Sequence, residues 1–250
     1  NRWWELNDFF AMVHLGWRYD TGTGVKQNPR EAASWYRLAG EQGGLSMAQN
    51  NLGCRYRDGR GVTQDYKTAS TLFRSAGLLG NRHAKTNLGW LYERGYGVAV
   101  DYPQALKLYT EAATEIRNPN TGALDPGHAM AQNNLGCLCR DGKGTRTDPY
   151  KAIKWFRKAA EQGNVAAQFN LGLRCAQGRG AEKDLEVAKE WLTKAAEKNH
   201  VAAQAHLADL LAGEDDADEA EAALLQVPGH DVRFLCRGRY GGRGEALGLP

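Results

Sequence analysis

The fold of this chain is decided by the stretch AQNNLGCRYRDGRG, residues 48–61, because versions of it return at a nearly constant spacing. A Leu, usually followed by Gly, marks the centre of each copy, and the markers are Leu15, Leu52, Leu88, Leu135, Leu171 and Leu207. The markers are 37, 36, 47, 36 and 36 residues apart. A period of this length is the signature of a solenoid, in which each unit stacks on its neighbours. We therefore interpret residues that recur once per unit as structural, and departures from the period as functional candidates.

The second copy predicts a pair of helices. Ala48, Leu52 and Tyr56 are four residues apart and form one stripe on a first helix. Gly53 lies beside this stripe, where the missing side chain lets another helix approach closely. The glycines of the turn at residues 58–61 can take positive φ and end the first helix. A second helix is then expected before the next unit begins.

The same boundaries recur along the chain. Each second helix is preceded by a side chain suited to capping it: Asn28, Asp65, Asp101, Asp148 and Asp184. The second helices are expected to close at Gly43, Gly80, Gly163 and Asn199, since these residue types tolerate positive φ. Each Gly-x-Gly follows a predicted helix rather than a strand, so we interpret it as an interhelical turn rather than a phosphate-binding loop.

The pattern A-x-x-x-L-G-x-x-Y-x-x-G-x-G, then Asp, then A-x-x-W-Y-x-x-A-A-x-x-G, resembles the Sel-1-like repeat, which is related to tetratricopeptide repeats. The match covers residues 8–199. The resemblance implies an all-α fold, an α/α solenoid wound as a right-handed superhelix of about five to six helix pairs. It also implies an adaptor or scaffold, as most proteins of that family are.

The period predicts the unit boundaries. We place repeat 1 at residues 8–43, repeat 2 at 44–80, repeat 3 at 81–127, repeat 4 at 128–163, repeat 5 at 164–199 and a degenerate capping repeat at 200–225. Residues 1–7 are expected to end a preceding unit. Residues 226–250 show no helical period and are expected to form a flexible Gly/Arg-rich tail. Their one short Arg/Gly tract is little evidence for RNA binding.

The 47-residue step contains an insertion at residues 117–127, which has the Pro and Gly content of a loop. We expect it to stand in place of the usual helix-closing Gly. Insertions in solenoids often lie beside binding faces. A neutral, tolerated loop is the alternative.

Composition and charge exclude several classes of function. The net charge of +3 is too small to indicate a nucleic-acid partner, and no apolar run is long enough for membrane insertion. The five cysteines cannot all pair, and Cys139 and Cys175 stand where three other units carry Tyr, which predicts buried thiols. With no signal segment visible after Asn1, these cysteines favour a cytoplasmic location. The histidines and cysteines form no metal-spaced cluster and no catalytic dyad, so we predict no metal, no cofactor, no catalytic residue and no enzyme.

Three positions of the first helices are candidates for a partner-binding groove. They lie one residue before, two after and three after the marker Leu, away from the buried stripe. The candidates are Asn51, Asn87, Asn134 and Asn170, then Trp17 and Trp90, then Arg18, Arg55 and Arg174. Trp and Arg are enriched in binding hot spots, and side-chain amides can hold an extended peptide. The alternative is that the Asn side chains hold neighbouring elements and the Trp side chains pack between first helices.

The sequence therefore predicts a non-enzymatic adaptor that binds a protein or peptide in the concave groove of a helical solenoid. The alternative is a bacterial envelope or secreted protein that acts in cell-wall or polysaccharide processes or in host interaction. The sequence makes no prediction of the oligomeric state.

Overall fold

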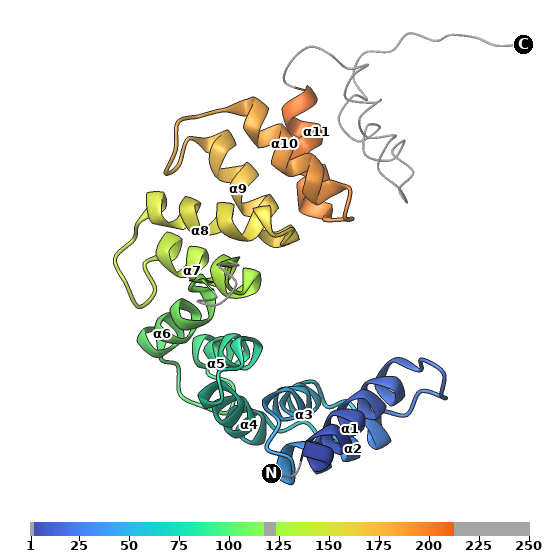
Figure 1. Cartoon of the computed structure of the whole chain (residues 1–250). Coiled ribbons are helices and arrows are strands. Elements are labelled where there is room, and N and C mark those ends of the chain that lie inside the picture. Colours follow the sequence, from blue (N-terminus) through green and yellow to red (C-terminus); the bar gives the residue numbers. More distant parts are fainter. Residues whose placement is uncertain (1–2, 118–123, 213–250) are drawn as a thin grey trace, which may run out of the picture. The chain divides into compact units, whose positions relative to one another are not determined.

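The computed structural model describes residues 3–117 and 124–212, and these form a helical solenoid (Figure 1). Its helices are α1 (Trp3–Thr21), α2 (Pro29–Glu41), α3 (Ser46–Asp58), α4 (Tyr66–Leu78), α5 (Arg82–Arg94), α6 (Tyr102–Ala113), α7 (Ala129–Asp141), α8 (Pro149–Glu161), α9 (Val165–Gln177), α10 (Leu185–Ala196) and α11 (Val201–Ala212). The chain divides into two compact units, Asn1–Lys158 and Ala159–Pro250. The all-α solenoid predicted from the period is confirmed.

The five predicted helix caps are confirmed. Each cap side chain accepts a hydrogen bond from a backbone N–H two or three residues further on, at the start of α2, α4, α6, α8 and α10. The caps are Asn28, Asp65, Asp101, Asp148 and Asp184. They satisfy backbone donors that the first turn of a helix leaves free, so each second helix has a defined start.

The glycine after each marker Leu lets the two helices of a unit pack closely. A Cβ added at Gly53 would lie 2.6 Å from a ring atom of Phe73, which is fully buried. The same approach occurs in the other repeats: Gly16 against Tyr36, Gly89 against Tyr109, Gly136 against Phe156 and Gly172 against Leu192. The close approach expected beside Gly53 is therefore present in all five.

The second glycine of the turn joins neighbouring repeats. Gly61 has φ +78° and lies against the backbone of Pro29 and Arg30, where the second helix of the preceding unit begins. A Cβ at Gly61 would lie 2.0 Å from the carbonyl oxygen of Pro29. Gly97 and Gly144 approach the starts of α4 and α6 in the same way. The turn is thus an inter-repeat packing point as well as the connection that the sequence predicted.

Glutamine side chains three residues before the marker also link successive units. Gln132 is fully buried, and its Nε2 donates to the carbonyl oxygen of Ala113 at 3.2 Å. Gln168 and Gln204 donate to Ala160 and Ala196 at the same distance, and Gln49 donates to Gly40 at 3.3 Å. In each case an amide satisfies a carbonyl at the end of the preceding second helix. Because Gln204 follows this rule, α11 packs as the first helix of a sixth unit.

Two boundaries differ from the sequence prediction. The positive φ at the end of α2 falls on Gly44 (+61°) rather than Gly43, because the first step of the period is one residue longer. Residues 3–7, which the sequence analysis set apart from repeat 1, lie in the same continuous helix, α1, as the start of that repeat. The expected end of the capping repeat and the tail at 226–250 lie outside the described residues.

The insertion begins and ends as a short hairpin stem. β1 (Ile116–Arg117) pairs antiparallel with β2 (Leu124–Asp125), with Ile116 opposite Asp125. The closing glycine that the sequence analysis considered replaced is present at Gly127, which has φ +81° just before α7. The insertion therefore displaces this glycine along the chain and does not remove it.

The cysteines that replace Tyr are buried, as predicted: Cys139 is 1% exposed and Cys175 3%. Burial raises the pKa of the Cys54 and Cys139 thiols. No helix of residues 3–117 and 124–212 is both long and apolar enough to cross a membrane. The same residues contain no group of three or more His, Cys, Asp or Glu side chains arranged to hold a metal ion.

Candidate functional site

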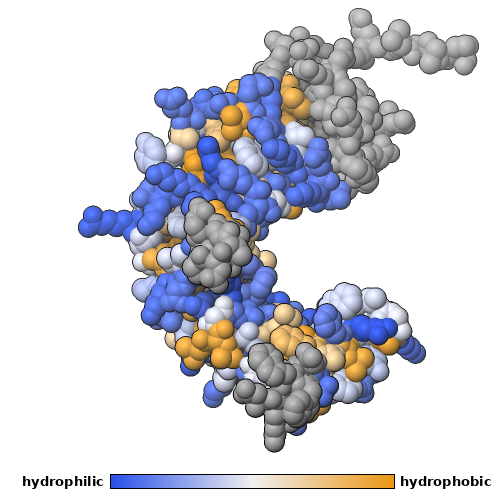
Figure 2. Space-filling model, viewed as in Figure 1, coloured by the Kyte–Doolittle hydropathy of each residue, from blue (hydrophilic) through white to orange (hydrophobic). Residues whose placement is uncertain are grey.

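The first helices of the N-terminal unit form one layer. In this unit α3, α5 and α7 lie on one side, and α4 and α6 lie on the other (Figure 1). Figure 2 shows hydrophobic residues reaching the surface over the N-terminal helices, beside a largely hydrophilic surface. The candidate groove residues Trp17, Asn51, Asn87, Trp90 and Asn134 all belong to this layer.

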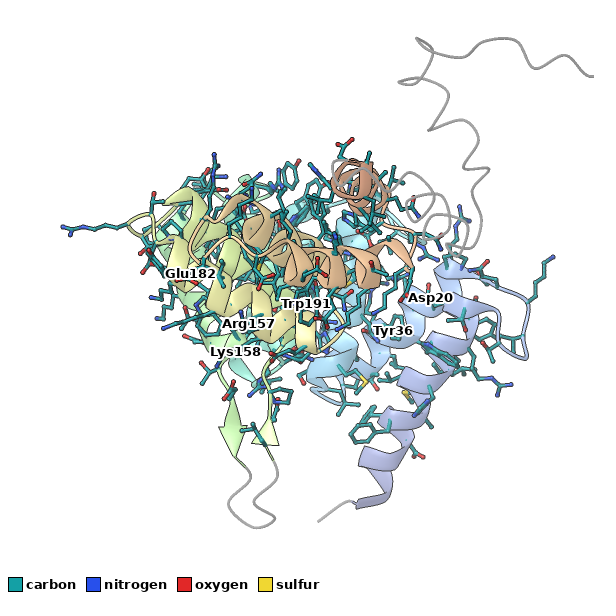
Figure 3. The ribbon with its side chains drawn as sticks, turned by 90° about the horizontal axis from the view of Figure 1, so that it is seen from above. Asp20, Tyr36, Arg157, Lys158, Glu182 and Trp191 are labelled. Carbon is teal, nitrogen blue, oxygen red and sulfur yellow. The ribbon has the colours of Figure 1, made fainter. Side chains whose placement is uncertain are left out.

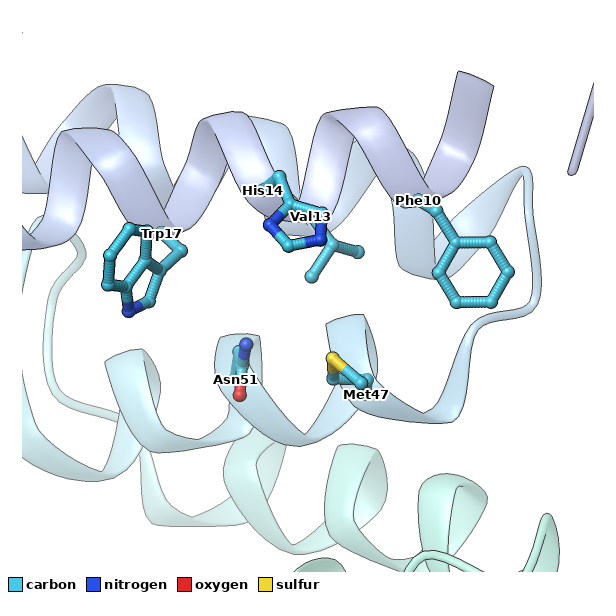
Figure 4. Close-up of a pocket in the computed structure, with 6 residues that line it drawn as sticks. All are labelled: Phe10, Val13, His14, Trp17, Met47 and Asn51. Atoms are coloured by element: carbon cyan, nitrogen blue, oxygen red, sulfur yellow. The ribbon is translucent and has the colours of Figure 1, made fainter. Parts of the chain in front are cut away.

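An open apolar pocket lies between α1 and α3. It has a volume of about 320 Å³, and its lining residues are Phe10, Val13, His14, Trp17, Met47 and Asn51. Phe10, Val13 and Trp17 extend from α1 toward α3, where Met47 and Asn51 lie opposite them (Figure 4). Phe10, Trp17 and Met47 are 46%, 48% and 52% exposed. Three large apolar side chains thus surround a space that is open to solvent.

The next cleft along the layer, between α3 and α5, is filled by polar contacts. The Asn87 amide donates to Asn50 at 3.1 Å, and its oxygen accepts from Arg57 at 2.9 Å. The Arg57 guanidinium also lies 5.9 Å from the ring centre of Trp90, whose other neighbour is Tyr96. Trp90 is consequently half-buried.

Three departures from the repeat pattern explain why the first cleft stays open. Val13 stands where α3 has Asn50, so it cannot hydrogen-bond across to Asn51. Trp17 stands in the place of Cys54 and projects into the cleft. Asp20 stands in the place of Arg57, and its carboxylate pairs with Arg55 on α3. The open pocket between α1 and α3 and the closed cleft between α3 and α5 therefore differ because of these three side chains.

Comparison with known families and structures identifies these units. The sequence model of the Sel1 repeat matches residues 10–44, 46–81, 82–115, 129–164 and 165–200, which is more than half of the chain. The chain belongs to the Sel1 repeat family. Sel1 repeat proteins are helical scaffolds that generally mediate protein interactions, and the family is generally non-enzymatic.

Solved Sel1 repeat structures resemble this chain over most of its length. One is c5321, a protective antigen of uropathogenic Escherichia coli strains with an SLR fold, at 34% identity and a TM-score of 0.69. The similar region covers 82% of this chain and 42% of that one, so this chain spans less than half of the antigen. Another is a Sel1 repeat protein from Oxalobacter formigenes, at 26% identity and a TM-score of 0.74, with 89% and 86% of the two chains covered. A search of curated proteins finds no match.

Two predicted groove arginines are held within the Sel1 repeats. Arg55 is 9% exposed and forms an ion pair with Asp20 of the preceding repeat. Arg18 is exposed, but its Nε donates to the Thr23 carbonyl at 3.0 Å and so supports its own turn. Little of the Arg55 side chain is therefore exposed, because the ion pair with Asp20 holds it within the solenoid.

The buried ion pair lies beside Tyr36 on α2, the ring that packs against Gly16. Burial, together with the nearby Asp20 carboxylate, raises the pKa of Tyr36 to about 12. The charge of Arg55 and a hydrogen bond from Asn51 oppose this rise. Asp20 and Tyr36 are labelled in Figure 3. Asn51 therefore both hydrogen-bonds to the Tyr36 hydroxyl and lines the edge of the pocket.

The other predicted asparagines also contact neighbouring repeats. Asn134 hydrogen-bonds to Tyr109, whose hydroxyl donates to Glu93 at 3.1 Å. Burial and the Glu93 carboxylate raise the Tyr109 pKa. Asn170 and Arg174 are half-buried on α9, in the C-terminal compact unit (Ala159–Pro250). The structure thus brings Trp17 and Asn51 together in the pocket and joins Asn87 to Trp90 through Arg57.

Phe10 and Met47 line the pocket but were not among the residues predicted from the sequence. Both stand five residues before their marker Leu, where repeat 4 has Met130, which is also 52% exposed. Phe10, His14 and Trp17 are spaced by four and three residues, which places them on one helix face. That spacing was the available signal. It was not used, because the candidate positions ran only from one residue before the marker Leu to three after it.

The base of the insertion carries a second group of titratable side chains. Thr86 and His128 Nδ1 are 2.8 Å apart, and the His83 ring packs edge-on against His128 at 4.3 Å. Burial, together with the charges of His83 and Arg82, lowers the His128 pKa to about 4. Arg82 pairs with Asp125 of β2 at 2.5 Å. These contacts tie the hairpin stem to α5.

Proposed function

We propose that this chain is a non-enzymatic adaptor that binds a protein or peptide through its first-helix layer. In this proposal the pocket between α1 and α3 takes one large apolar side chain of the ligand. The single observation that carries the proposal is the open apolar pocket at Trp17 and Met47. At the equivalent position of the next cleft, between α3 and α5, Arg57 and Asn87 close the space.

The chemistry of the pocket supports an apolar anchor. Trp17, Phe10 and Met47 supply aromatic and thioether surface, which gives most of the energy when an apolar side chain leaves water. His14 and Asn51 add polar groups that can meet the ligand backbone. Anchors of this kind, surrounded by weaker contacts, dominate the affinity of many interfaces.

Asn87, Asn134, Asn170, Trp90, Arg18 and Arg174 remain candidate contacts in an extended groove. Their inter-repeat contacts support the alternative role for Asn87, Trp90 and Asn134, namely holding the solenoid together. We therefore propose the pocket residues as the primary contacts and the remaining candidates as secondary ones.

The chain offers a matched pair of variants for the test. Met47 and Met130 occupy the same repeat position and have the same exposure of 52%, but only Met47 lines the pocket between α1 and α3. Peptides would be selected from a phage-displayed random library on the unmodified chain, and their affinities measured by fluorescence anisotropy. We expect Met47→Glu to weaken binding about tenfold or more, because it places a charge in the apolar pocket, and Met130→Glu to change it little.

The outcome that contradicts the proposal is equally clear. Equal loss of affinity in Met47→Glu and Met130→Glu, or no loss in either, would place the binding surface elsewhere. Far-UV circular dichroism of both variants would verify that the helices remain formed.

A second candidate function is host contact by a surface or secreted protein. The observation in its favour is the 34% identity to c5321, itself a protective antigen of Escherichia coli. Protease accessibility on intact cells of the source organism would test it, because a protein exposed at the surface is cleaved without cell lysis. Protection until lysis would exclude this candidate.

A further inference from the structure

A positively charged surface lies on α8, outside the first-helix layer. Residues 143–158 contain six cationic side chains and one acidic side chain, whereas the net charge of the whole chain is only +3. The acid is Asp148, which accepts the backbone N–H of Lys151 at 2.8 Å as the cap of α8. The positive charge of this segment is therefore concentrated, and its single carboxylate is engaged by the helix.

The cations of α8 form a stripe along one helix. Lys151, Lys154 and Arg157 are spaced by three residues, so they are neighbours on the helix surface, and all three are exposed. None of them has a carboxylate within ion-pair distance among the residues that the structure describes. Fixed positive charges without local partners favour an anionic ligand.

Aromatic side chains give this stripe an apolar component. Tyr150 is 71% exposed, and the Trp155 ring lies beneath the Lys158 ammonium at 5.4 Å. Lys158 also pairs with Glu115 at 2.6 Å, which holds it at one edge of the stripe (Arg157 and Lys158 are labelled in Figure 3). A shallow depression of about 440 Å³ lies among Tyr150, Lys151, Lys154, Trp155, Lys158 and Asp148. We call this set, with Arg157, the α8 basic face.

We propose that the α8 basic face is a second docking surface, and that its ligand is an acidic, extended segment of a partner protein. Neighbouring cations on one helix face are about 5–6 Å apart. Carboxylates at alternate positions of an extended chain are about 6.6 Å apart, so two or three can meet Lys151, Lys154 and Arg157 in succession. Tyr150 and Trp155 then receive an apolar side chain of the same segment.

The size of the stripe favours a polypeptide over a nucleic acid. Lys151 to Lys158 covers about 10 Å of helix at 1.5 Å per residue. Proteins that hold single-stranded nucleic acid follow its backbone with a basic groove over about four or more nucleotides and stack bases on aromatic rings. A short stripe on one helix supplies too few phosphate contacts for that mode of binding.

The test compares two triple variants of the full chain that change the net charge equally. Lys151→Glu, Lys154→Glu and Arg157→Glu reverse the α8 basic face, whereas Lys26→Glu, Arg30→Glu and Lys67→Glu reverse three exposed cations elsewhere. The probe is a fluorescein-labelled peptide with Glu at alternate positions and one central Trp, followed by fluorescence anisotropy. We expect the first triple variant to weaken binding about tenfold or more and the second to weaken it less than about threefold.

Further measurements decide between the possible outcomes. The single substitution Tyr150→Ala should weaken binding without a change in charge, and the same peptide with Gln in place of Glu should not bind. Equal loss in both triple variants would show attraction by net charge alone and overturn the proposal. Tighter binding of a labelled single-stranded RNA, lost in the first triple variant, would overturn the assignment of an acidic polypeptide.

Discussion

Gly53 on α3 lies directly against the ring of Phe73 on α4, and no β-carbon fits between them. The two nearest ring atoms would be 2.6 and 2.9 Å from a Cβ at this position, and Phe73 is fully buried. The same relationship sets the distance between the two helices of each Sel1 repeat.

We predict that Gly53→Ala destabilises the chain although alanine is the better helix former. Alanine gains about 1 kcal/mol in helix propensity, but overpacking a buried ring typically costs about 1–3 kcal/mol. The control is Gly77→Ala on α4, where the nearest atom to the added Cβ would be Cγ of the flexible Lys85 side chain, at 3.2 Å, and the nearest backbone atom would be at an ordinary 3.8 Å. Urea denaturation should show a lower midpoint for Gly53→Ala and an unchanged or higher one for Gly77→Ala. The reverse order would refute the packing argument.

A second prediction concerns the glutamines that link successive repeats. Gln132 donates to the carbonyl oxygens of Ala113 and Pro126, at 3.2 and 2.6 Å, and is fully buried. Gln132→Leu leaves these acceptors without the amide, and we expect a loss of about 2 kcal/mol in unfolding free energy. Gln49→Leu should cost less than about 1 kcal/mol, because Gln49 is only half-buried and water can replace its single bond to Gly40. Equal losses would show that burial of the amide is not what matters.

The period of the marker Leu was sufficient to predict the fold. Asp65 and its equivalents could be recognised as caps because capping depends on neighbours in the sequence. The role of Gln132 could not be recognised, since its acceptor Ala113 lies in another unit and the insertion separates them. Local signals were therefore read correctly, whereas contacts between repeats required the structure.

The pocket was only partly predictable for the same reason. Trp17 was found because it departs from the repeat pattern, and Asn51 because Asn recurs at its position in the central units. The burial of Arg55 could not be predicted, because it depends on Asp20 in the preceding unit. Phe10 and Met47 were missed, because a pocket is defined by two helices and by the side chains that fail to fill the space between them.

The two tryptophans at equivalent positions should behave differently. Trp17 is 48% exposed, whereas Trp90 is half-buried and packs with the core of repeats 2 and 3 beneath Arg57. Trp17→Ala should lower the free energy of unfolding by less than about 1 kcal/mol, and Trp90→Ala by about 2–3 kcal/mol. Denaturation midpoints measure this difference. If Trp17→Ala proved as destabilising as Trp90→Ala, Trp17 would be a packing residue and the case for a ligand pocket would weaken.

Arg55 gives a prediction about electrostatics within the solenoid. The Arg55 and Asp20 side chains are only 11% and 15% exposed, so removal of Arg55 leaves the nearly buried Asp20 carboxylate with the more exposed Arg60, at 3.6 Å, as its ion-pair partner. We expect Arg55→Ala to cost about 3 kcal/mol or more, and the double variant with Asp20→Ala to cost less than the sum of the two single changes. A double-mutant cycle measured by urea denaturation gives the coupling. Additive losses would mean that the pair contributes little to stability.

Titration of His128 should make the chain less stable in mild acid. Its pKa in the folded chain is lowered to about 4 from an ordinary value of 6.5, so the unfolded chain binds this proton more readily. The unfolding free energy therefore falls as the pH decreases from about 6.5 to 4, and it recovers as the pH rises. The ring is only partly buried, so we expect a loss of about 2 kcal/mol rather than the full linkage value.

His128→Gln keeps a polar group near Thr86 but cannot titrate, and the difference between the two proteins isolates this contribution from other groups. Denaturant unfolding at several pH values measures it, and parallel pH profiles for the two proteins would show that another group causes the acid sensitivity.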